Sequence, residues 1–229
     1  ASHGEFKIAR ATMRGFQTVI VHLSHKGVEG LGEARPAIFY DDETAEAVVQ
    51  TLAKAESLLG DDPFQIEDIV NRVSEAFPKA HASLAGLDIA LHDLVGKMLG
   101  VPVYKLLGLN PHRIPQCSFT VGIADPAVMA ERASNIAPYK VLKVKVGLQD
   151  DEAVLTAIRK VTDVPIRVDA NIGWTPQKAV DMINRLERFN IEFVEQPIPP
   201  GDNEGLRYVR ERVNIPIMAD ESSVKLSDL

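Results

Sequence analysis

Acidic residues close three successive apolar runs in the second half of this chain, at intervals of about 25 residues. They are Asp169, Glu195 and Asp220, and each run is short and apolar, as in a buried strand. Such an interval accommodates one strand, one helix and two short loops. Because the carboxyl ends of parallel strands meet at one edge of a sheet, a βα repeat would gather the three charges. Gathering like charges is costly unless a cation is bound, so the pattern predicts a metal site.

A fourth run of the same kind precedes these three and carries Lys143 and Lys145. Two residues apart on a strand, their side chains share one face and lie about 6–7 Å apart. We expect a neighbouring ammonium group and a metal to lower a lysine pKa toward neutrality, so that the amine can act as a general base. Alternatively, both lysines point outward while Leu142, Val144 and Val146 fill the interior. The adjacent carboxylates favour the inward orientation, and with it a metal-stabilised enolate with lysine as proton acceptor.

The chemistry of the three acids indicates which metal they suit. Carboxylate oxygens are ligands for Mg²⁺ or Mn²⁺, and these strand ends carry no histidine or cysteine that would favour zinc. Any one acid alone would more simply be a helix cap or a solvated loop residue. Three in one register favour a metal site. Further candidates for substrate binding are Asn171, Thr120, Arg10 and Arg14.

Two regions of different character make up the chain, and the change falls near Arg113. Residues 1–113 predict an α+β domain, with a hairpin of strands at 18–23 and 28–34 followed by helices ending near 59, 77 and 99. Residues 114–229 predict an α/β domain of alternating strands and helices. The expected strands span 116–121, 141–146, 166–169, 193–195 and 217–219, and the helices between them span 126–137, 151–161, 176–189 and 203–213.

Five parallel strands in βα order fit either a doubly wound sheet or part of a (β/α)8 barrel. A functional residue on nearly every strand end favours the barrel. A barrel of this type needs roughly 250 residues, whereas only 116 follow Arg113 in this chain of 229. We therefore expect an incomplete barrel of about five of the eight strands, in a chain truncated at its C-terminus.

Composition narrows the class of protein. The net charge of −7 without a basic cluster argues against nucleic acid as a partner. No apolar run approaches the roughly 20 residues of a membrane helix, and the first ten residues do not resemble a signal peptide. With Cys117 as its one cysteine, the chain suits a reducing compartment. We expect a cytoplasmic homo-oligomer that contacts neither membrane nor nucleic acid.

Taken together, these motifs resemble those of the enolase superfamily. The matching segments are Lys143-Val144-Lys145, Val168-Asp169-Ala170-Asn171, Glu195-Gln196-Pro197 and Ala219-Asp220-Glu221-Ser222. Gly30-Leu31-Gly32-Glu33-Ala34 resembles the hairpin of that superfamily's capping domain, so the α+β domain would be a capping domain. The superfamily uses a lysine or histidine base with Mg²⁺ that stabilises an ene-diolate.

The Lys-x-Lys strand with aspartate as third ligand is similar to the muconate-lactonizing subgroup, and residues 6–10 resemble the substrate-covering loop of dipeptide epimerases. The resemblance implies Mg²⁺ held by Asp169, Glu195 and Asp220. It implies Lys145 as the acid/base, and Lys143 as a residue that tunes its pKa and contacts the substrate. It also implies that Arg10 binds the side-chain carboxylate of an Ala-Glu type dipeptide and that Thr120 touches substrate.

This resemblance predicts a magnesium-dependent racemase or epimerase that removes the proton α to a carboxylate, acting on dipeptides. A muconate-type cycloisomerase or an o-succinylbenzoate-synthase-like dehydratase would share the same half-site. A Schiff-base aldolase using Lys145 is an alternative from another enzyme class. A non-enzymatic fragment that serves as an interaction module is a further one. The partner lysine and the ammonium-binding acids of an epimerase would lie beyond Leu229, so we expect this chain alone to be inactive.

Overall fold

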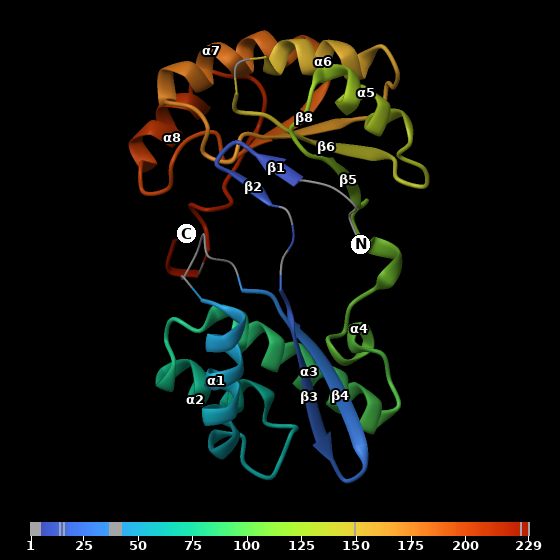
Figure 1. Ribbon diagram of the computed structural model, residues 1–229, viewed down its shortest axis with the longest axis vertical. Helices are drawn as coiled ribbons and strands as arrows, with labels where there is room; N and C mark the ends of the chain where they lie inside the picture. Colours follow the sequence, from blue (N-terminus) through green and yellow to red (C-terminus); the bar gives the residue numbers. More distant parts are fainter. Residues whose placement is uncertain are drawn as a thin grey trace. The chain divides into compact units, whose positions relative to one another are not determined.

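The structure is a computed structural model that describes residues 6–13, 15, 17–36, 43–148, 150–224 and 226–228. It forms two compact units (Figure 1). Residues 16–114 form the first, here called the α+β unit, and residues 1–15 together with 115–229 form the second, here called the barrel unit. The domain boundary predicted at residue 113 stays a prediction. The structure groups residues 1–15 with the barrel unit and not with the α+β unit. None of the helices in the described ranges is long and apolar enough to cross a membrane.

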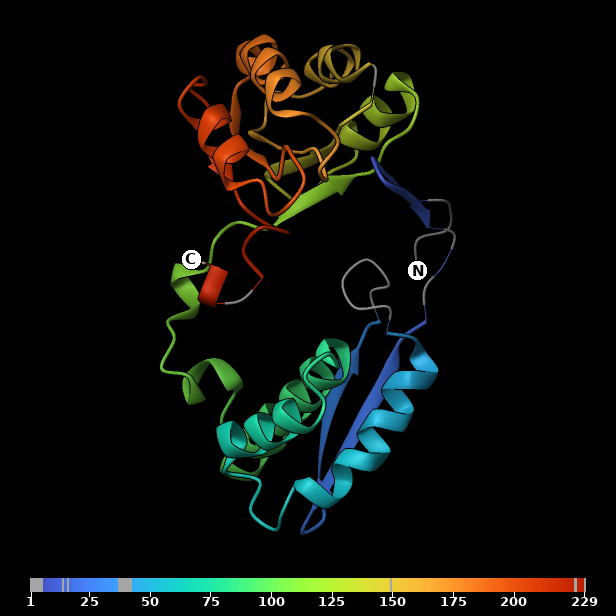
Figure 2. The same ribbon diagram turned by 90° about the vertical axis from the view of Figure 1, so that its left-hand side faces the viewer.

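The α+β unit consists of one antiparallel hairpin and the helices packed beside it (Figure 2). Its elements are β3 (Val19–His25), β4 (Val28–Ala34), α1 (Ala45–Ala55), η1 (Glu56–Leu58), α2 (Ile66–Ala76), α3 (His81–Leu99), α4 (Val103–Leu106) and η2 (Pro111–Arg113). Thr44 caps α1 by accepting the N–H of Ala47 at 3.1 Å.

The hairpin packs closely on α3 because glycine, which has no side chain, occupies the points of contact. A Cβ placed on Gly32 of β4 would lie 2.0 Å from the carbonyl oxygen of Gly86 in α3. A Cβ on Gly86 would lie 2.8 Å from the Cβ of Ala34. The Gly-x-Gly segment of the hairpin therefore lets the strand backbone pack directly on the helix.

The barrel unit carries a five-stranded parallel sheet in the order β5-β6-β7-β8-β9. Its strands are β5 (Ser118–Val121), β6 (Val141–Lys145), β7 (Ile166–Asp169), β8 (Ile191–Glu195) and β9 (Ile217–Met218). The alternating helices are α5 (Pro126–Ser134), α6 (Asp151–Arg159), α7 (Pro176–Leu186) and α8 (Asn203–Arg210), with η3 (Glu187–Phe189) after α7 and η4 (Leu226–Asp228) near the C-terminus. The prediction of an incomplete parallel βα barrel with five strands is confirmed.

One apolar core joins this sheet to its helices, which cover one face of it (Figure 1). Leu142 and Val144 of β6 are fully buried, as is Leu155 of α6. Strands β6 to β8 thus turn branched residues toward the helices, while the alternating positions Lys143 and Lys145 are only partly buried. Burial of the apolar face toward the helices fixes the register that places the strand ends side by side.

A small antiparallel hairpin precedes the α+β unit and belongs to the barrel unit. It pairs β1 (Phe6–Ile8) with β2 (Ala11–Met13), with Arg10 in the turn. The N–H of Ile123, just after β5, donates to the carbonyl of Lys7 at 2.8 Å. A Cβ on Gly147, just after β6, would lie 2.9 Å from the Cβ of Ala9. These contacts place the hairpin at the carboxyl ends of the strands.

The observed elements differ from the predicted ones mainly at their ends. The helix predicted to run to residue 189 ends at Leu186 and continues as the 3-10 turn η3. The hairpin of β1 and β2 was not predicted, because its two three-residue strands have no clear alternating pattern. The single cysteine, Cys117, is exposed.

Arg159, in the last turn of α6, binds the loops at the end of the sheet opposite the lysines and carboxylates. Its guanidinium donates to the carbonyls of Phe189 at 2.6 and 2.9 Å, Val164 at 2.6 Å, Thr162 at 3.2 Å and Asn190 at 3.2 Å. One side chain therefore satisfies carbonyls from two separate loops, which would otherwise lack partners at helix ends.

We predict that Arg159→Met lowers the free energy of unfolding by about 2–3 kcal/mol, since several charge-assisted hydrogen bonds are lost and partly buried carbonyls are left unpaired. Urea denaturation followed by circular dichroism measures the loss. Arg185→Met is the matched control, because Arg185 occupies the last turn of α7 and is exposed. Equal stability of the two variants would contradict this account of Arg159.

Candidate active site

The two lysines of β6 lie against the carboxylates that end β7 and β8. Strand register places Lys145 beside Asp169, and Asp169 beside Glu195. The Nζ of Lys145 donates to Oδ2 of Asp169 at 2.6 Å, and the Nζ of Lys143 lies 2.9 Å from the same oxygen. Lys143 also donates to Oε1 of Glu195 at 2.6 Å. Both lysine side chains therefore face the carboxylates and not the helices.

Burial and ion pairing act in opposite directions on these carboxyl groups. Burial raises the pKa of Asp169, but the ammonium groups of Lys145 and Lys143 outweigh it and hold the pKa below its usual value. Burial also raises the pKa of Glu195, and the nearby charge of Asp169 raises it further. Together these two effects outweigh the opposing effect of Lys143, so the pKa of Glu195 lies above its usual value. Two neighbouring strand ends thus hold one carboxyl that ionises readily and one that resists ionisation.

Lys143 is held in its charged form by the carboxylates it contacts. Burial lowers the pKa of its ammonium group, but the hydrogen bonds and charges of Glu195 and Asp169 outweigh burial, and the pKa is raised above its usual value. The predicted fall of a lysine pKa toward neutrality concerns a lysine beside a bound metal, with Lys143 as the residue that tunes Lys145, and it stays a prediction.

The third predicted ligand, Asp220, lies in the loop after β9 and does not end the strand itself. It is partly buried, and its N–H donates to Oε1 of Gln196 at 2.9 Å. Within the described residues, no three acidic, histidine or cysteine side chains are gathered closely enough to hold a metal ion. The structure thus brings Asp169 and Glu195 together, but it does not gather Asp220 with them into one cluster.

The donor chemistry of these strand ends nevertheless fits a hard divalent cation. Asn171 is only 4% exposed, and its Oδ1 has no hydrogen-bond partner in the part of the chain that the structure describes. Its N–H donates to Oδ1 of Asp169 at 2.9 Å. A buried carbonyl oxygen without a donor is costly, and a cation would remove that cost. Asn171, Asp169, Glu195 and Asp220 all offer the oxygen atoms that Mg²⁺ prefers.

Arg10 is paired with an acid that sequence reasoning gave no role. Its Nη2 lies 2.8 Å from Oε1 of Glu221, the residue after Asp220. The Glu221 side chain is 4% exposed, and its pKa is raised by burial and by the charges of Asp220 and Asp169, against the opposing effect of Arg10. The sequence held one signal for Glu221, since it directly follows a predicted ligand, but its partner on the distant hairpin could not be inferred.

Of the remaining predicted binding residues, Thr120 and Arg14, the structure describes Thr120. Thr120 is exposed on β5, where the register pairs it with Lys143 on the next strand. Its position is consistent with a surface that a substrate could reach. Arg14 lies outside the described residues.

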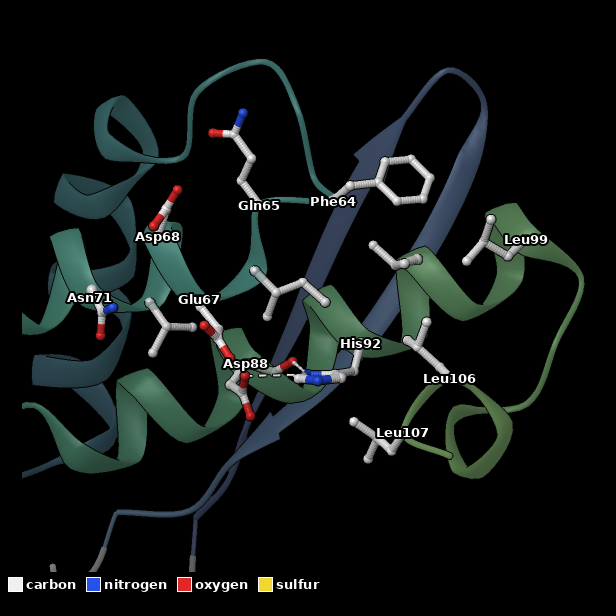
Figure 3. Close-up of a pocket in the computed structure, with 13 residues that line it drawn as sticks. Phe64, Gln65, Glu67, Asp68, Asn71, Asp88, His92, Leu99, Leu106 and Leu107 are labelled. Atoms are coloured by element: carbon white, nitrogen blue, oxygen red, sulfur yellow. Dashed lines mark hydrogen bonds and ion pairs between the residues drawn. The ribbon is translucent and has the colours of Figure 1, made fainter. Parts of the chain in front are cut away.

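A surface hollow of about 890 Å³ lies elsewhere, in the α+β unit (Figure 3). It is lined by residues of α2, α3 and α4 and of the turn before α2, among them Phe64, Asp88 and His92. Within it, Nδ1 of His92 lies 3.0 Å from the backbone carbonyl oxygen and 3.2 Å from Oδ1 of Asp88, one helical turn away on α3 (Figure 3). None of the predicted site residues lines it, so we place the candidate chemistry at the strand ends, where lysines and buried carboxylates meet, and not in this hollow.

Comparison with known protein families matches both parts of the chain. Residues 1–108 match the mandelate racemase / muconate lactonizing enzyme N-terminal domain. Residues 127–229 match the family described as enolase C-terminal domain-like. An L-Ala-D/L-Glu epimerase of Bacteroides thetaiotaomicron is 41% identical over 226 residues, which cover 98% of this chain and 59% of the relative. A hydrophobic dipeptide epimerase of Enterococcus faecalis is 38% identical and is covered to 65%.

Solved structures agree with these relatives. A dipeptide epimerase from Enterococcus faecalis, complexed with Mg and the dipeptide L-Leu-L-Tyr, aligns with a TM-score of 0.92 at 36% identity, over 99% of this chain and 66% of its own. A substrate-liganded L-Ala-D/L-Glu epimerase from Bacillus subtilis aligns with a TM-score of 0.91 at 32% identity and the same coverage. The chain thus spans about 60% to 66% of the length of these relatives.

Asp151 supports the loop that follows the lysine strand. It is 3% exposed at the start of α6, and its carboxyl oxygens accept the N–H groups of Gly147 at 3.0 and 3.1 Å and Leu148 at 3.3 Å. Burial raises the pKa of Asp151 more than these hydrogen bonds lower it. The ionised form is therefore less favourable in the folded protein than in the unfolded chain.

This shift predicts a pH-dependent stability difference. In the native protein, Asp151 contributes to the free energy of unfolding because the folded state binds its proton more tightly than the unfolded chain does. This contribution falls as the pH rises from 3.8, the ordinary pKa of an aspartate, through the raised pKa of Asp151 in the folded protein. The free energy of unfolding of Asp151→Asn, minus that of the native protein, should therefore rise over this window and then level off. Denaturation between pH 3.5 and pH 8, roughly, measures it. Asp150→Asn, exposed just before the helix, controls for loss of a charge; a difference that is flat or falls with pH would contradict the assignment.

Proposed function

Because this chain belongs to the enolase superfamily, with the N- and C-terminal domains of its mandelate racemase and muconate lactonizing enzymes, we propose that the complete protein is a magnesium-dependent dipeptide epimerase. One observation of this structure carries the proposal. Lys143 and Lys145 face two buried carboxylates at adjacent strand ends, so a basic group and an oxygen-rich cation site lie side by side. This is the arrangement required for removing a proton next to a carboxylate.

In this mechanism Lys145 is the base. It lies at the carboxyl end of β6, it is less exposed than Lys143, and its Nζ pairs with Oδ2 of Asp169 at 2.6 Å. Its neutral amine removes the proton from the α-carbon, the electron pair of the C–H bond moves into the carboxylate group, and an enolate forms. Return of a proton to the opposite face of the α-carbon would complete epimerisation.

Lys143 would serve as a fixed positive charge. Its ammonium group, which pairs with Asp169 and Glu195 in this structure, would attract the carboxylate of the substrate while Lys145 acts on the α-carbon. Asp169, Glu195 and Asp220 would hold Mg²⁺, with Asn171 beside them. When bound, Mg²⁺ supplies positive charge that stabilises the developing negative charge on the substrate carboxylate. Mn²⁺ has the same preference for oxygen ligands and should substitute for it.

The proposal of a dipeptide substrate is supported by relatives of this chain and by its hairpin. The relatives named above act on Ala-Glu or on hydrophobic dipeptides. Arg10 lies at the turn of the hairpin over the strand ends, where it could meet the side chain of a substrate. Thr120 would contact the substrate from β5. Relatives are also racemases of N-succinylated arginine and lysine, so the acylated amino group is the shared feature of these substrates.

We predict that the complete protein exchanges the α-proton of its dipeptide substrate for deuterium in D₂O, and that EDTA abolishes exchange until Mg²⁺ or Mn²⁺ is restored. Lys145→Ala should lower exchange from one epimer by about 10²–10⁴-fold while metal binding persists, because only the base on one face is lost. Proton NMR of Ala-Glu and hydrophobic dipeptides measures both rates.

Lys140→Ala is the matched control, since Lys140 is exposed immediately before the same strand. Absence of metal-dependent exchange with every dipeptide of the panel would sink the proposal. Borohydride trapping of Lys145 with a carbonyl substrate would instead favour the Schiff-base chemistry of an aldolase.

A further inference from the structure

We propose that Gln196 is a positioning residue that sets the spacing of the three predicted metal ligands. The inference rests on the proposed function, because it concerns the same metal site, and it assigns a role to a residue that follows Glu195 directly in the chain. Its backbone and its side chain together connect Glu195, at the end of β8, to the loop that follows Asp169 and to the loop that carries Asp220.

The backbone of Gln196 continues the pairing between the strands beyond their ends. Its N–H donates to the carbonyl of Met218 at 2.9 Å, and its own carbonyl accepts the N–H of Ile172 at 2.9 Å. Met218 lies two residues before Asp220, and Ile172 lies three residues after Asp169. This one residue therefore fixes the end of β9 and the loop that follows β7 to the chain that follows β8.

The side-chain amide of Gln196 holds the Asp220 loop in place. Its Oε1 accepts the N–H of Asp220 at 2.9 Å and the N–H of Ser222 at 3.1 Å. Its Nε2 donates to the hydroxyl of Ser222 at 2.8 Å and to the carbonyl of Ile198 at 2.8 Å. Both donors and both lone pairs of the amide are thus used. The two bonds that Oε1 accepts reach the backbone on either side of Glu221, so they restrain the loop itself.

An ordinary buried glutamine is the simpler explanation, and two observations argue against it. First, Gln196 is fully buried, and an apolar side chain of similar size could fill the same space without needing four hydrogen bonds. Second, its φ is +34°, a left-handed conformation that is unfavourable for a residue with a Cβ and that the surrounding bonds must maintain. The chain retains a strained, fully hydrogen-bonded amide between the ligand loops, where it determines their geometry.

This role explains how a loop residue can serve as a ligand. Asp169 and Glu195 are held by their strands, whereas Asp220 follows a strand of only two residues. Asp220 therefore depends on its loop for position, and the loop depends on Gln196. Partners that orient a ligand typically change metal affinity by about 10–100-fold when removed.

The test measures Mn²⁺ affinity by titration followed by electron paramagnetic resonance, in the complete protein and its variants. Gln196→Met keeps the volume but removes the amide, and we expect Mn²⁺ affinity to fall about 10–100-fold, with an altered spectrum of the bound ion. Ser222→Ala removes one partner of the amide and should give a smaller loss. Asp169→Asn, which removes a predicted ligand, should give a larger one. Gln177→Met, at an exposed position on α7, should bind as the native protein does.

Amide hydrogen exchange by NMR adds a measurement that does not depend on metal. In Gln196→Met the N–H groups of Asp220 and Ser222 should exchange faster than in the native protein, while those of α7 stay unchanged. If Gln196→Met does not fold, the same two measurements on Ser222→Ala decide the matter, and unchanged affinity with unchanged exchange overturns the role of Gln196.

The outcomes separate this inference from the proposed function. Native-like Mn²⁺ affinity of Gln196→Met, with weakened binding in Asp169→Asn, would overturn the role of Gln196 and leave the metal site standing. Absence of Mn²⁺ binding by the native protein would overturn both.

Discussion

The site depends on a balance of charge at the ends of three adjacent parallel strands. Two ammonium groups, on Lys143 and Lys145, neutralise two buried carboxylates, on Asp169 and Glu195. The two carboxylates would not be stable without the two lysines, because an unpaired buried charge costs several kcal/mol. The register of the strands brings the four side chains together, and the buried apolar faces of those strands fix the register. The strand register therefore determines both the packing of these strands and the arrangement of the candidate catalytic side chains.

The same balance indicates how a cation and a substrate would use the site. The carboxylates hold lysine ammonium groups by hydrogen bonds of 2.6 to 2.9 Å, so a metal bound by Asp169 and Glu195 would replace those contacts. Lysines released from the carboxylates would then be able to face a substrate. The buried Oδ1 of Asn171, which has no hydrogen-bond partner within the described residues, and the carboxylate of Asp220 on its restrained loop offer further oxygen atoms.

Much of this could be predicted from the sequence, because it follows from periodicity. Alternation along β6 places Lys143 and Lys145 on one face, and the βα interval places Asp169 next to Glu195. What the sequence could not provide depends on contacts between distant segments. Gln196 belongs to a recognisable motif, yet its bonds to Asp220 and Ser222 appear only once the strands are aligned.

Two further differences have the same origin. The raised pKa of Lys143 could not be predicted, because the like charge of Lys145 is visible on its own strand, whereas the carboxylates that outweigh burial come from other strands. The pairing of Arg10 with Glu221 joins residues from opposite ends of the chain, and the two short strands of the hairpin left no clear pattern. Local sequence patterns predict the strands and helices and which side chains share a face. Contacts between residues far apart in the sequence become known only from the structure.

A crystal structure of the complete protein with Mg²⁺ and a slowly reacting dipeptide tests the central claim most directly. Our account predicts that Asp169, Glu195 and Asp220 coordinate the ion, at about 2.0–2.1 Å. It also predicts that the Nζ of Lys145 lies within about 3–3.5 Å of the α-carbon of the substrate. A structure in which both lysines still bind Asp169, with the ion and the dipeptide elsewhere, would contradict it.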